Sequence, residues 1–302
     1  MIETKTRLEF HIPTLEDAAW AAPLLRASGR MACETSFTTI YMWRRHYHNE
    51  IATDGTHVFL RTGGEDPVYQ LPTVDRLKEG VELLLEDAHA RGHKLRLFGE
   101  DRETVSRLET LFPGKFSFTP SRDDFDYIYR QSDLSQLAGR KYHGKRNHIA
   151  AFSRQYAWEY ETITRENIPE VAALAQDWCR QRGNCKTSAN PELRAECCAI
   201  QEALGHWEAL RLSGGLIRVD GKARAFTFGS PINDEMIDVH VEKALPAFAG
   251  LYPIINREAV TREWAAYTYI NRENDMGLEG LRKAKESYHP AILLEKYIAS
   301  ER

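Results

Sequence analysis

The chain has 302 residues, of which 42% are hydrophobic and 28% charged, a balance that is typical of a soluble globular protein and excludes a fibrous or disordered one. Its formal net charge of −4 gives no global attraction to nucleic acid or anionic lipid, so such binding would need a local basic patch. No basic leader precedes an apolar run at the N-terminus, and no stretch approaches the roughly 18 apolar residues of a membrane span. We therefore expect a cytoplasmic protein of two domains.

Strands and helices alternate in the first half of the sequence. Thr14 caps the first expected helix, and Asp17 follows it at the spacing of a capping box. Residues 33–52 are dense in aromatic and hydroxyl side chains. The other expected elements are strands at 56–62 and 67–72, a helix at 74–92, a strand at 94–99, a helix at 101–112 and a strand at 123–130. Together they predict a first α/β domain, residues 1–135.

The second half, residues 136–302, begins with a helix that contains residues 141–152. Asp220 and Gly221 form a typical two-residue hairpin turn, which predicts a three-stranded antiparallel meander at 214–244. The other expected elements are a strand at 156–163, helices at 167–183, 191–210 and 247–266, a strand at 267–271, a helix at 277–287 and a strand at 291–298.

A lysine lies on the apolar stripe of the helix at 141–152. At 100° per residue that stripe consists of Tyr142, Ile149, Phe152 and Tyr156. Lys145 projects into it, which is unfavourable unless its ammonium is paired or reaches a cavity. Lys145 and its neighbours Arg146 and Asn147 are therefore candidates for binding an anion. The alternative is that the ammonium escapes to solvent along the helix face.

The number of cysteines is odd, and no C-x-x-C pair is present, which favours reduced structural thiols over disulfides. A metal site built from Cys179, Cys185 and a histidine is an alternative, but the paired spacing of metal ligands is lacking. We expect no metal.

Three segments carry a resemblance to known proteins: SFTTIYMWR at 36–44, KYHGKRNHIAAF at 141–152 and YINRENDMGLEGLRKAKESYHPAILLEKY at 269–297. With them the chain resembles a bacterial family of unassigned function, related to the C-terminal domain of phosphatidylglycerol lysyltransferase. The order of elements in the second half also resembles the fold of GNAT acyltransferases. The resemblance implies an α/β (α+β) protein with two GNAT-like domains in tandem, whose mixed, mostly antiparallel sheets are flanked by helices.

The same resemblance implies a donor. In the lysyltransferases and the Fem-type aminoacyltransferases, an aminoacyl group carried on tRNA passes to an amine or hydroxyl acceptor, so aminoacyl-tRNA is the expected partner and no cofactor is implied. The flippase part of the full lysyltransferases is absent from this sequence, which puts a lipid acceptor in doubt. The glycine-rich acetyl-CoA loop of GNAT enzymes is also absent. In its place is EKALPAFAGLY, where Pro246 lacks an N–H and Gly250 is the one glycine, a poor cradle for pyrophosphate.

The third meander strand offers the catalytic candidates. Regular alternation would place Asp238, His240 and Glu242 in a row on one strand face. Acyl transfer needs a base for the acceptor, and we expect Glu242 in that role, with His240 as second choice and Asp238 beside the substrate. An exposed or structurally paired polar face is the alternative.

Further candidates follow in the C-terminal segment. Tyr269 and Asn271 share one strand face and could donate to an oxyanion or hold the acceptor, unless they only end a strand. Arg282 and Lys283, with Lys285 nearby, form a basic cluster that suits phosphate, with a solvated helix end as the alternative.

The first domain supplies candidates for a cleft between the two domains. Trp43 is expected to contact the substrate, and its companions in the cleft are Glu34, Ser36, Tyr41 and Arg44, although this segment also suits an ordinary core and rim. Two other classes of function stay open. One is a CoA-dependent N-acyltransferase of a small molecule, and the other is a non-catalytic binding protein.

Overall fold

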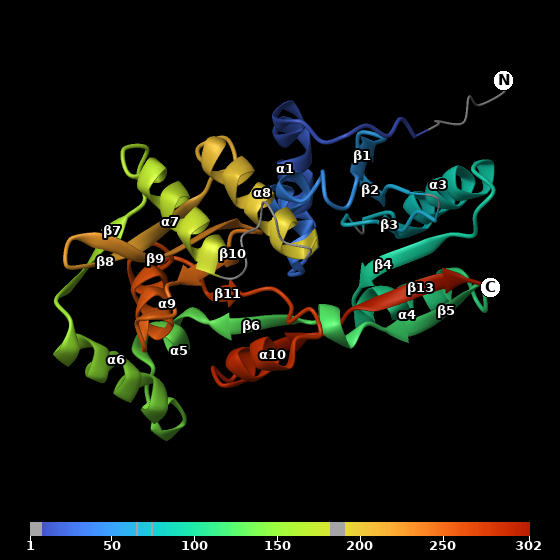
Figure 1. Ribbon diagram of the computed structural model, residues 1–302. Helices are drawn as coiled ribbons and strands as arrows, with labels where there is room; N and C mark the ends of the chain where they lie inside the picture. The colour runs from blue at the N-terminus through green and yellow to red at the C-terminus, as the bar shows by residue number, and fades with distance from the viewer. Residues whose placement is uncertain (1–7, 65, 74, 182–190) are drawn as a thin grey trace. The chain divides into compact units, whose positions relative to one another are not determined.

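The structure, a computed structural model, describes residues 8–302 apart from 65, 74 and 182–190, and divides the chain into two compact units (Figure 1). The first unit comprises Met1–Asp126, Asn274–Glu279 and Leu293–Arg302, and the second comprises Tyr127–Glu273 and Gly280–Ile292. This differs from the expected division at residue 135, because the C-terminal strand pairs inside the first sheet rather than the second.

The first unit contains a six-stranded sheet in the order β1-β2-β3-β4-β13-β5. Its strands are β1 (Asn49–Thr53), β2 (Val58–Thr62), β3 (Tyr69–Gln70), β4 (Arg96–Glu100), β5 (Phe116–Pro120) and β13 (Tyr297–Glu301). Its helices are η1 (Leu15–Asp17), α1 (Ala18–Ala27), η2 (Cys33–Thr35), α2 (Phe37–Met42), α3 (Leu77–Ala90), α4 (Arg102–Leu111) and η3 (Arg122–Asp124). Figure 1 shows the red C-terminal strand β13 between β4 and β5.

The core of the first unit lies under α3. This helix buries a stripe at helical spacing, formed by Leu77, Val81, Leu84, Leu85 and Ala88. The stripe packs with strand residues that include Phe59, Tyr69, Leu97 and Ala299. Phe59 and Ala299, which are 240 residues apart in the sequence, therefore share one core.

The second unit contains a seven-stranded sheet in the order β12-β6-β11-β10-β9-β8-β7. Its strands are β6 (Asp126–Arg130), β7 (Trp158–Thr162), β8 (Ser213–Val219), β9 (Lys222–Pro231), β10 (Met236–Ala244), β11 (Tyr269–Asn271) and β12 (Ile292–Leu294). Its helices are α5 (Gln131–Gln136), η4 (Arg140–Tyr142), α6 (His143–Gln155), α7 (Ile168–Gln181), α8 (Pro191–Gly205), α9 (Leu251–Arg262) and α10 (Glu279–Glu286).

Helices cover both faces of the second sheet. On one face, Ile254 and Ile255 of α9 pack with Ile237 and Val239 of β10 in a single buried cluster. On the other face, Lys243 of β10 reaches α7 and α8, where its Nζ lies 3.9 Å from the centroid of Trp178 and 2.5 Å from Glu196 Oε1. Polar side chains on either face are therefore under helices rather than in open solvent.

Several local predictions are confirmed. Asp220 and Gly221 both have positive φ, of 51° and 72°, as the hairpin turn requires. Asp17 Oδ2 accepts the backbone N–H of Thr14 at 2.7 Å, as the capping-box spacing predicts.

Strands β1 and β5 and helix α5 were not expected. Both sheets are mixed and flanked by helices, as expected for the fold class. None of the helices in the described part of the chain has the length and apolar character that crossing a membrane requires.

Candidate active site

A β-bulge in β10 determines which polar side chains lie together. Val239 pairs with Gly229 of β9, whereas Val241 pairs with the preceding residue, Phe228. His240 is therefore the additional residue, and the alternation of faces reverses beyond it. Regular alternation cannot be extrapolated across this point of the strand.

The bulge corrects the expectation of a single catalytic row. Asp238 is paired with Ser230 and shares its face of the sheet. Glu242 lies on the opposite face, where its carboxylate contacts Asn256 of α9. The predicted row of Asp238, His240 and Glu242 on one face is therefore wrong, and two separate polar clusters take its place.

The first cluster is centred on Glu242, and we call Glu242, Arg272, Asn256 and Lys145 the Glu242 cluster. Glu242 Oε1 accepts from Arg272 Nη2 at 2.8 Å, and Oε2 accepts from Asn256 Nδ2 at 2.9 Å. The side chains of Glu242 and Arg272 are only 11% and 12% exposed. Both carboxylate oxygens are thus held by N–H donors in a site from which most water is excluded.

Arg272 provides the positive charge next to this carboxylate. Burial alone would lower its pKa, but the charge of Glu242 and its hydrogen bond hold the pKa of Arg272 above its usual value. The guanidinium carbon lies 4.8 Å from the ring centroid of Tyr288 and 5.7 Å from that of Tyr129. Arg272 Nη1 and Asn256 Oδ1 are both buried and have no hydrogen-bond partner among the described residues.

Lys145 of α6 completes the cluster. Its Nζ donates to Ser287 Oγ at 2.7 Å and lies 3.7 Å from the centroid of the Tyr288 ring. Burial and repulsion by Arg272 lower the pKa of Lys145 to about 8, although Glu242 acts in the opposite direction. The lysine that the helical stripe singles out is therefore partly desolvated and close to a second cation.

Lys285 fixes the end of β11 from which Arg272 projects. Its Nζ donates to the backbone oxygens of Arg272 at 2.5 Å and of Glu273 at 3.1 Å, and its side chain is buried. The carbonyl of Lys285 in turn accepts from the Tyr129 hydroxyl at 2.7 Å. Lys285 therefore positions the backbone next to the cluster, in contrast to the phosphate-binding alternative for its helix.

The second cluster lies on the opposite face of the sheet. His240 Nε2 is 2.8 Å from Ser230 Oγ, and His240 Nδ1 is 3.4 Å from both Asp238 Oδ2 and Glu273 Oε1. The imidazole is 1% exposed.

Tyr269 and Asn271 share one face of β11, as expected from the sequence. Asn271 is paired with Asp238 of β10, which places both residues on the His240 face rather than the Glu242 face. Asn271 Oδ1 accepts the backbone N–H of Glu273 at 2.7 Å, and the guanidinium of Arg130 lies 6.0 Å from the Tyr269 ring centroid. Their proposed role as oxyanion donors stays a prediction.

The remaining predicted binding residues are dispersed. Arg146 Nη1 donates to the carbonyl oxygens of Leu137 and Gly139, and Asn147 Nδ2 lies 3.0 Å from His143 Nε2. Arg146 therefore stabilises the backbone that follows α5, rather than joining Lys145 in the Glu242 cluster. Arg282 is half-buried and Lys283 is exposed. Trp43 lies in the first unit, where it packs with the rings of His46 and Tyr47.

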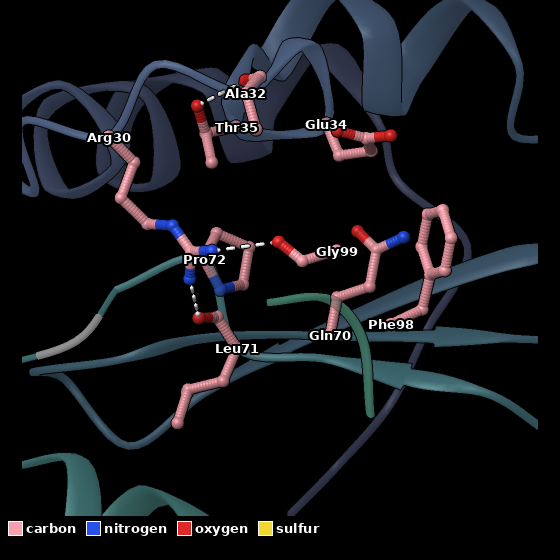
Figure 2. Close-up of a pocket in the computed structure, with 9 residues that line it drawn as sticks. All are labelled: Arg30, Ala32, Glu34, Thr35, Gln70, Leu71, Pro72, Phe98 and Gly99. Carbon is pink, nitrogen blue, oxygen red and sulfur yellow. Dashed lines mark hydrogen bonds between the residues drawn. The ribbon is translucent and has the colours of Figure 1, made fainter. Parts of the chain in front are cut away.

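The first unit has a pocket of its own, lined in part by Arg30, Glu34, Gln70 and Phe98 (Figure 2). The Arg30 guanidinium donates to the carbonyl oxygens of Leu71 at 3.2 Å and Gly99 at 2.9 Å, as the dashed lines in Figure 2 show. Both oxygens of Glu34 accept from Lys296 Nζ at 2.7 Å. These groups are occupied by internal contacts within the unit.

Two groups in the described residues have the ligand types of a metal site. One contains Cys33, Glu34 and Asp126, but the ammonium of Lys296 donates to both carboxylates and so takes the position of a cation. The other contains Asp238, His240 and Glu273. Cys185, one of the residues of the alternative metal site considered from the sequence, lies outside the described residues, and Cys179 is buried and forms no disulfide.

A family model for the C-terminal part of phosphatidylglycerol lysyltransferase matches residues 25–300 of the chain. The chain belongs to this family. This confirms the family to which the three sequence segments pointed, since the match spans nearly the whole chain.

Solved structures agree with this assignment. A conserved protein of unknown function from Bacteroides thetaiotaomicron is 39% identical, with a TM-score of 0.91 over 98% of this chain and 100% of that one. L-PGS from Bacillus licheniformis shares the fold at 15% identity, with a TM-score of 0.68 over 96% and 93% of the two chains. FemX shares it at 10% identity, with a TM-score of 0.59 over 96% of each chain. No curated protein matches the sequence.

Sequence reasoning missed several residues of the Glu242 cluster in this member of the lysyltransferase C-terminal family. Arg272 lies within the segment at 269–297 that carries the family resemblance, so a signal for it was present. Asn256 shows no signal of its own, because it is recognised as a neighbour of Glu242 only in the folded chain.

Proposed function

We propose that this chain is an acyltransferase that moves an aminoacyl group from aminoacyl-tRNA to an amine or hydroxyl acceptor, and that it consists of two GNAT-like domains in tandem. The observation that carries the proposal is the family match over residues 25–300. The fold shared with L-PGS and FemX supports it. The lipid acceptor in the family's name is one of the hydroxyl acceptors that the proposal includes.

The start of α9 supports a donor other than CoA. In the GNAT arrangement implied by the resemblance, a pyrophosphate needs free N–H groups at this helix N-terminus. Here a Cβ on Gly250 would lie only 2.8 Å from the carbonyl oxygen of His148, so that α6 packs directly against the beginning of α9. The space beside the backbone at this point is filled by α6, which disfavours pyrophosphate binding and with it the CoA-dependent alternative.

The chemistry of the proposed reaction is simple to balance. The acceptor nitrogen or oxygen attacks the ester carbonyl carbon, the bond from that carbon to the ribose oxygen breaks, and the acceptor proton finally resides on the ribose hydroxyl. An attacking amine becomes positively charged and therefore acidic, so a neighbouring carboxylate can take its proton. Glu242, which accepts hydrogen bonds from Arg272 and Asn256, is our proposed base, with His240 as second choice.

The contacts of Glu242 favour it over His240. Glu242 lies in a site with a second cation and two tyrosine rings, whereas His240 is 1% exposed and engaged with Ser230 and two carboxylates. Asp238, Tyr269 and Asn271 share the face of His240, so we propose that they support that second cluster.

A transfer assay tests the proposal. Total tRNA charged with radiolabelled amino acids is incubated with the protein and a panel of amine and hydroxyl acceptors, including phosphatidylglycerol vesicles. The proposal requires that label moves from tRNA to at least one acceptor and that Glu242→Gln lowers the transfer by at least about 100-fold while tRNA binding persists. Transfer of an acetyl group from acetyl-CoA under the same conditions, without any from tRNA, would instead support the CoA-dependent function.

A further inference from the structure

The Glu242 cluster carries more positive than negative charge. Lys145 and Arg272 are both cations, and among the described residues Glu242 is the one carboxylate in the contacts of the cluster. Both cations approach the same ring, since Lys145 Nζ lies 3.7 Å and the Arg272 guanidinium carbon 4.8 Å from the centroid of Tyr288. An uncompensated charge in a site of low polarity is unfavourable, which calls for a counter-ion.

The donors needed to bind such a counter-ion are present. Arg272 Nη2 donates to the carboxylate of Glu242, but Arg272 Nη1 is buried and has no hydrogen-bond partner among the described residues. A buried guanidinium N–H without an acceptor is rare and costly, and a ligand oxygen would satisfy it. Ser287 Oγ accepts from Lys145 Nζ at 2.7 Å and donates to the Ala284 carbonyl oxygen at 2.6 Å, so it positions the ammonium and leaves the other N–H groups of Lys145 for the ligand.

We propose that Lys145 and Arg272 form a subsite for a singly charged oxygen anion, either a phosphodiester or a carboxylate. One negative charge would neutralise the cluster, and Arg272 Nη1 together with Lys145 Nζ would supply its hydrogen bonds. Because Lys145 is partly exposed and Ser287 exposed, the anion can approach from solvent beside α6. The subsite deepens the proposed function, since both anions occur in substrates of that chemical class, but its existence can be tested separately.

The charges around Lys145 decide how its pKa should change when an anion binds. The titratable or charged groups that face it are Arg272, Glu242 and Tyr288, and those about one turn away along the chain are Lys141 of η4 and His148 of α6. Burial and Arg272 lower the pKa of Lys145 to about 8. An anion between the two cations would favour the charged form, and the pKa of Lys145 should therefore rise when the anion binds.

The test follows this titration by carbon-13 NMR of lysine-labelled protein, with the Lys145 signal assigned by its loss in Lys145→Met. Titrations are run in dimethyl phosphate, in acetate and in chloride at one ionic strength. We expect the pKa of Lys145 to rise by roughly one unit in at least one of the two oxygen anions relative to chloride. A rise with dimethyl phosphate alone assigns a phosphodiester, and a rise with acetate alone assigns a carboxylate.

Two variants make the result specific. Arg272→Lys keeps the positive charge but removes the second N–H, and it should abolish the response to the anion while the protein stays folded. Lys222→Met, at the exposed first position of β9 in the same unit, should leave the response unchanged. An unchanged Lys145 pKa in both anions, or an equal response in Arg272→Lys, overturns the subsite. Active aminoacyl transfer with no anion response would leave the proposed function intact, and an anion response without transfer would refute only the function.

Discussion

The ammonium of Lys296 lies 2.8 Å from Asp126 Oδ1 in the first unit, and neither side chain is exposed. The other carboxylate oxygen of Asp126 accepts the backbone N–H of Cys33 at 2.8 Å, and Glu34 contacts the same ammonium. Although burial acts in the opposite direction, the carboxylates hold the pKa of Lys296 well above its usual value. This ion cluster links the beginning of β13 to the segment before α2.

Replacing Lys296 by Met should destabilise the protein. The change removes the cation but leaves two carboxylates in a buried site, which typically costs about 3–5 kcal/mol. Urea unfolding followed by circular dichroism measures the free energy of unfolding. Lys78→Met, on the exposed side of α3, is the matched control and should change it by less than about 0.5 kcal/mol. Equal stability of the two variants would contradict the assigned role of the buried cluster.

Gly229 should be intolerant of substitution because it lies opposite the bulge in β10. A Cβ at this position would lie 2.2 Å from the carbonyl oxygen of Asp238, so one of the two strands must move. We expect Gly229→Ala to destabilise the protein by about 1–3 kcal/mol, measured by the same urea method. Gly144→Ala, at a helical position with open space around the added carbon, should not be destabilising. A neutral Gly229→Ala variant would show that β10 adapts without strain.

Lys145 should make stability depend on pH in the alkaline range. Its pKa is lowered to about 8 in the folded protein, below the value of about 10.4 for an unperturbed lysine. Between these values the unfolded state binds more protons, so stability contributed by this position rises with pH and is constant below the folded pKa. Urea midpoints of unfolding are compared at pH 7 and pH 10. We expect the midpoint of the wild type to rise relative to that of Lys145→Met between these two pH values. A difference between the two proteins that does not change with pH would show that Lys145 titrates normally.

Glu242→Gln should reduce aminoacyl transfer by at least about 100-fold, the usual loss when a base is removed. The amide keeps the size of the side chain but cannot take the acceptor proton, and binding of tRNA should be unchanged. Circular dichroism must show that the variant is folded, because Arg272 loses its counter-charge. Glu235→Gln, at an exposed turn before β10, serves as the control. Full turnover in the Glu242→Gln variant would show that another group is the base, with His240 as the next candidate.

The sequence predicted those features that depend on neighbouring residues. The hairpin at Asp220 and Gly221 follows from the turn chemistry of two adjacent positions, and the structure shows the required positive φ angles. The position of Lys145 on an apolar helix stripe follows from the helical period, and its ammonium is indeed partly desolvated against Tyr288. Such local features can be predicted without knowing which distant segments pack against them.

Features set by long-range pairing could not be predicted in this way. The additional residue at His240 is visible only in the register between β9 and β10, and without it the alternation places Glu242 on the wrong face. Arg272 and Asn256 reach Glu242 from positions 30 and 14 residues away in the sequence. The pairing of β13 with β4 and β5 likewise brings the C-terminus into the first unit, although the sequence suggested a simple division into two halves.

The most direct test of the central claim is to measure whether this protein moves a radiolabelled aminoacyl group from tRNA to an amine or hydroxyl acceptor. We predict transfer that requires Glu242 and that acetyl-CoA does not inhibit. The absence of transfer to any acceptor of the panel from fully charged tRNA, with the protein folded and the tRNA intact, would contradict the proposed function.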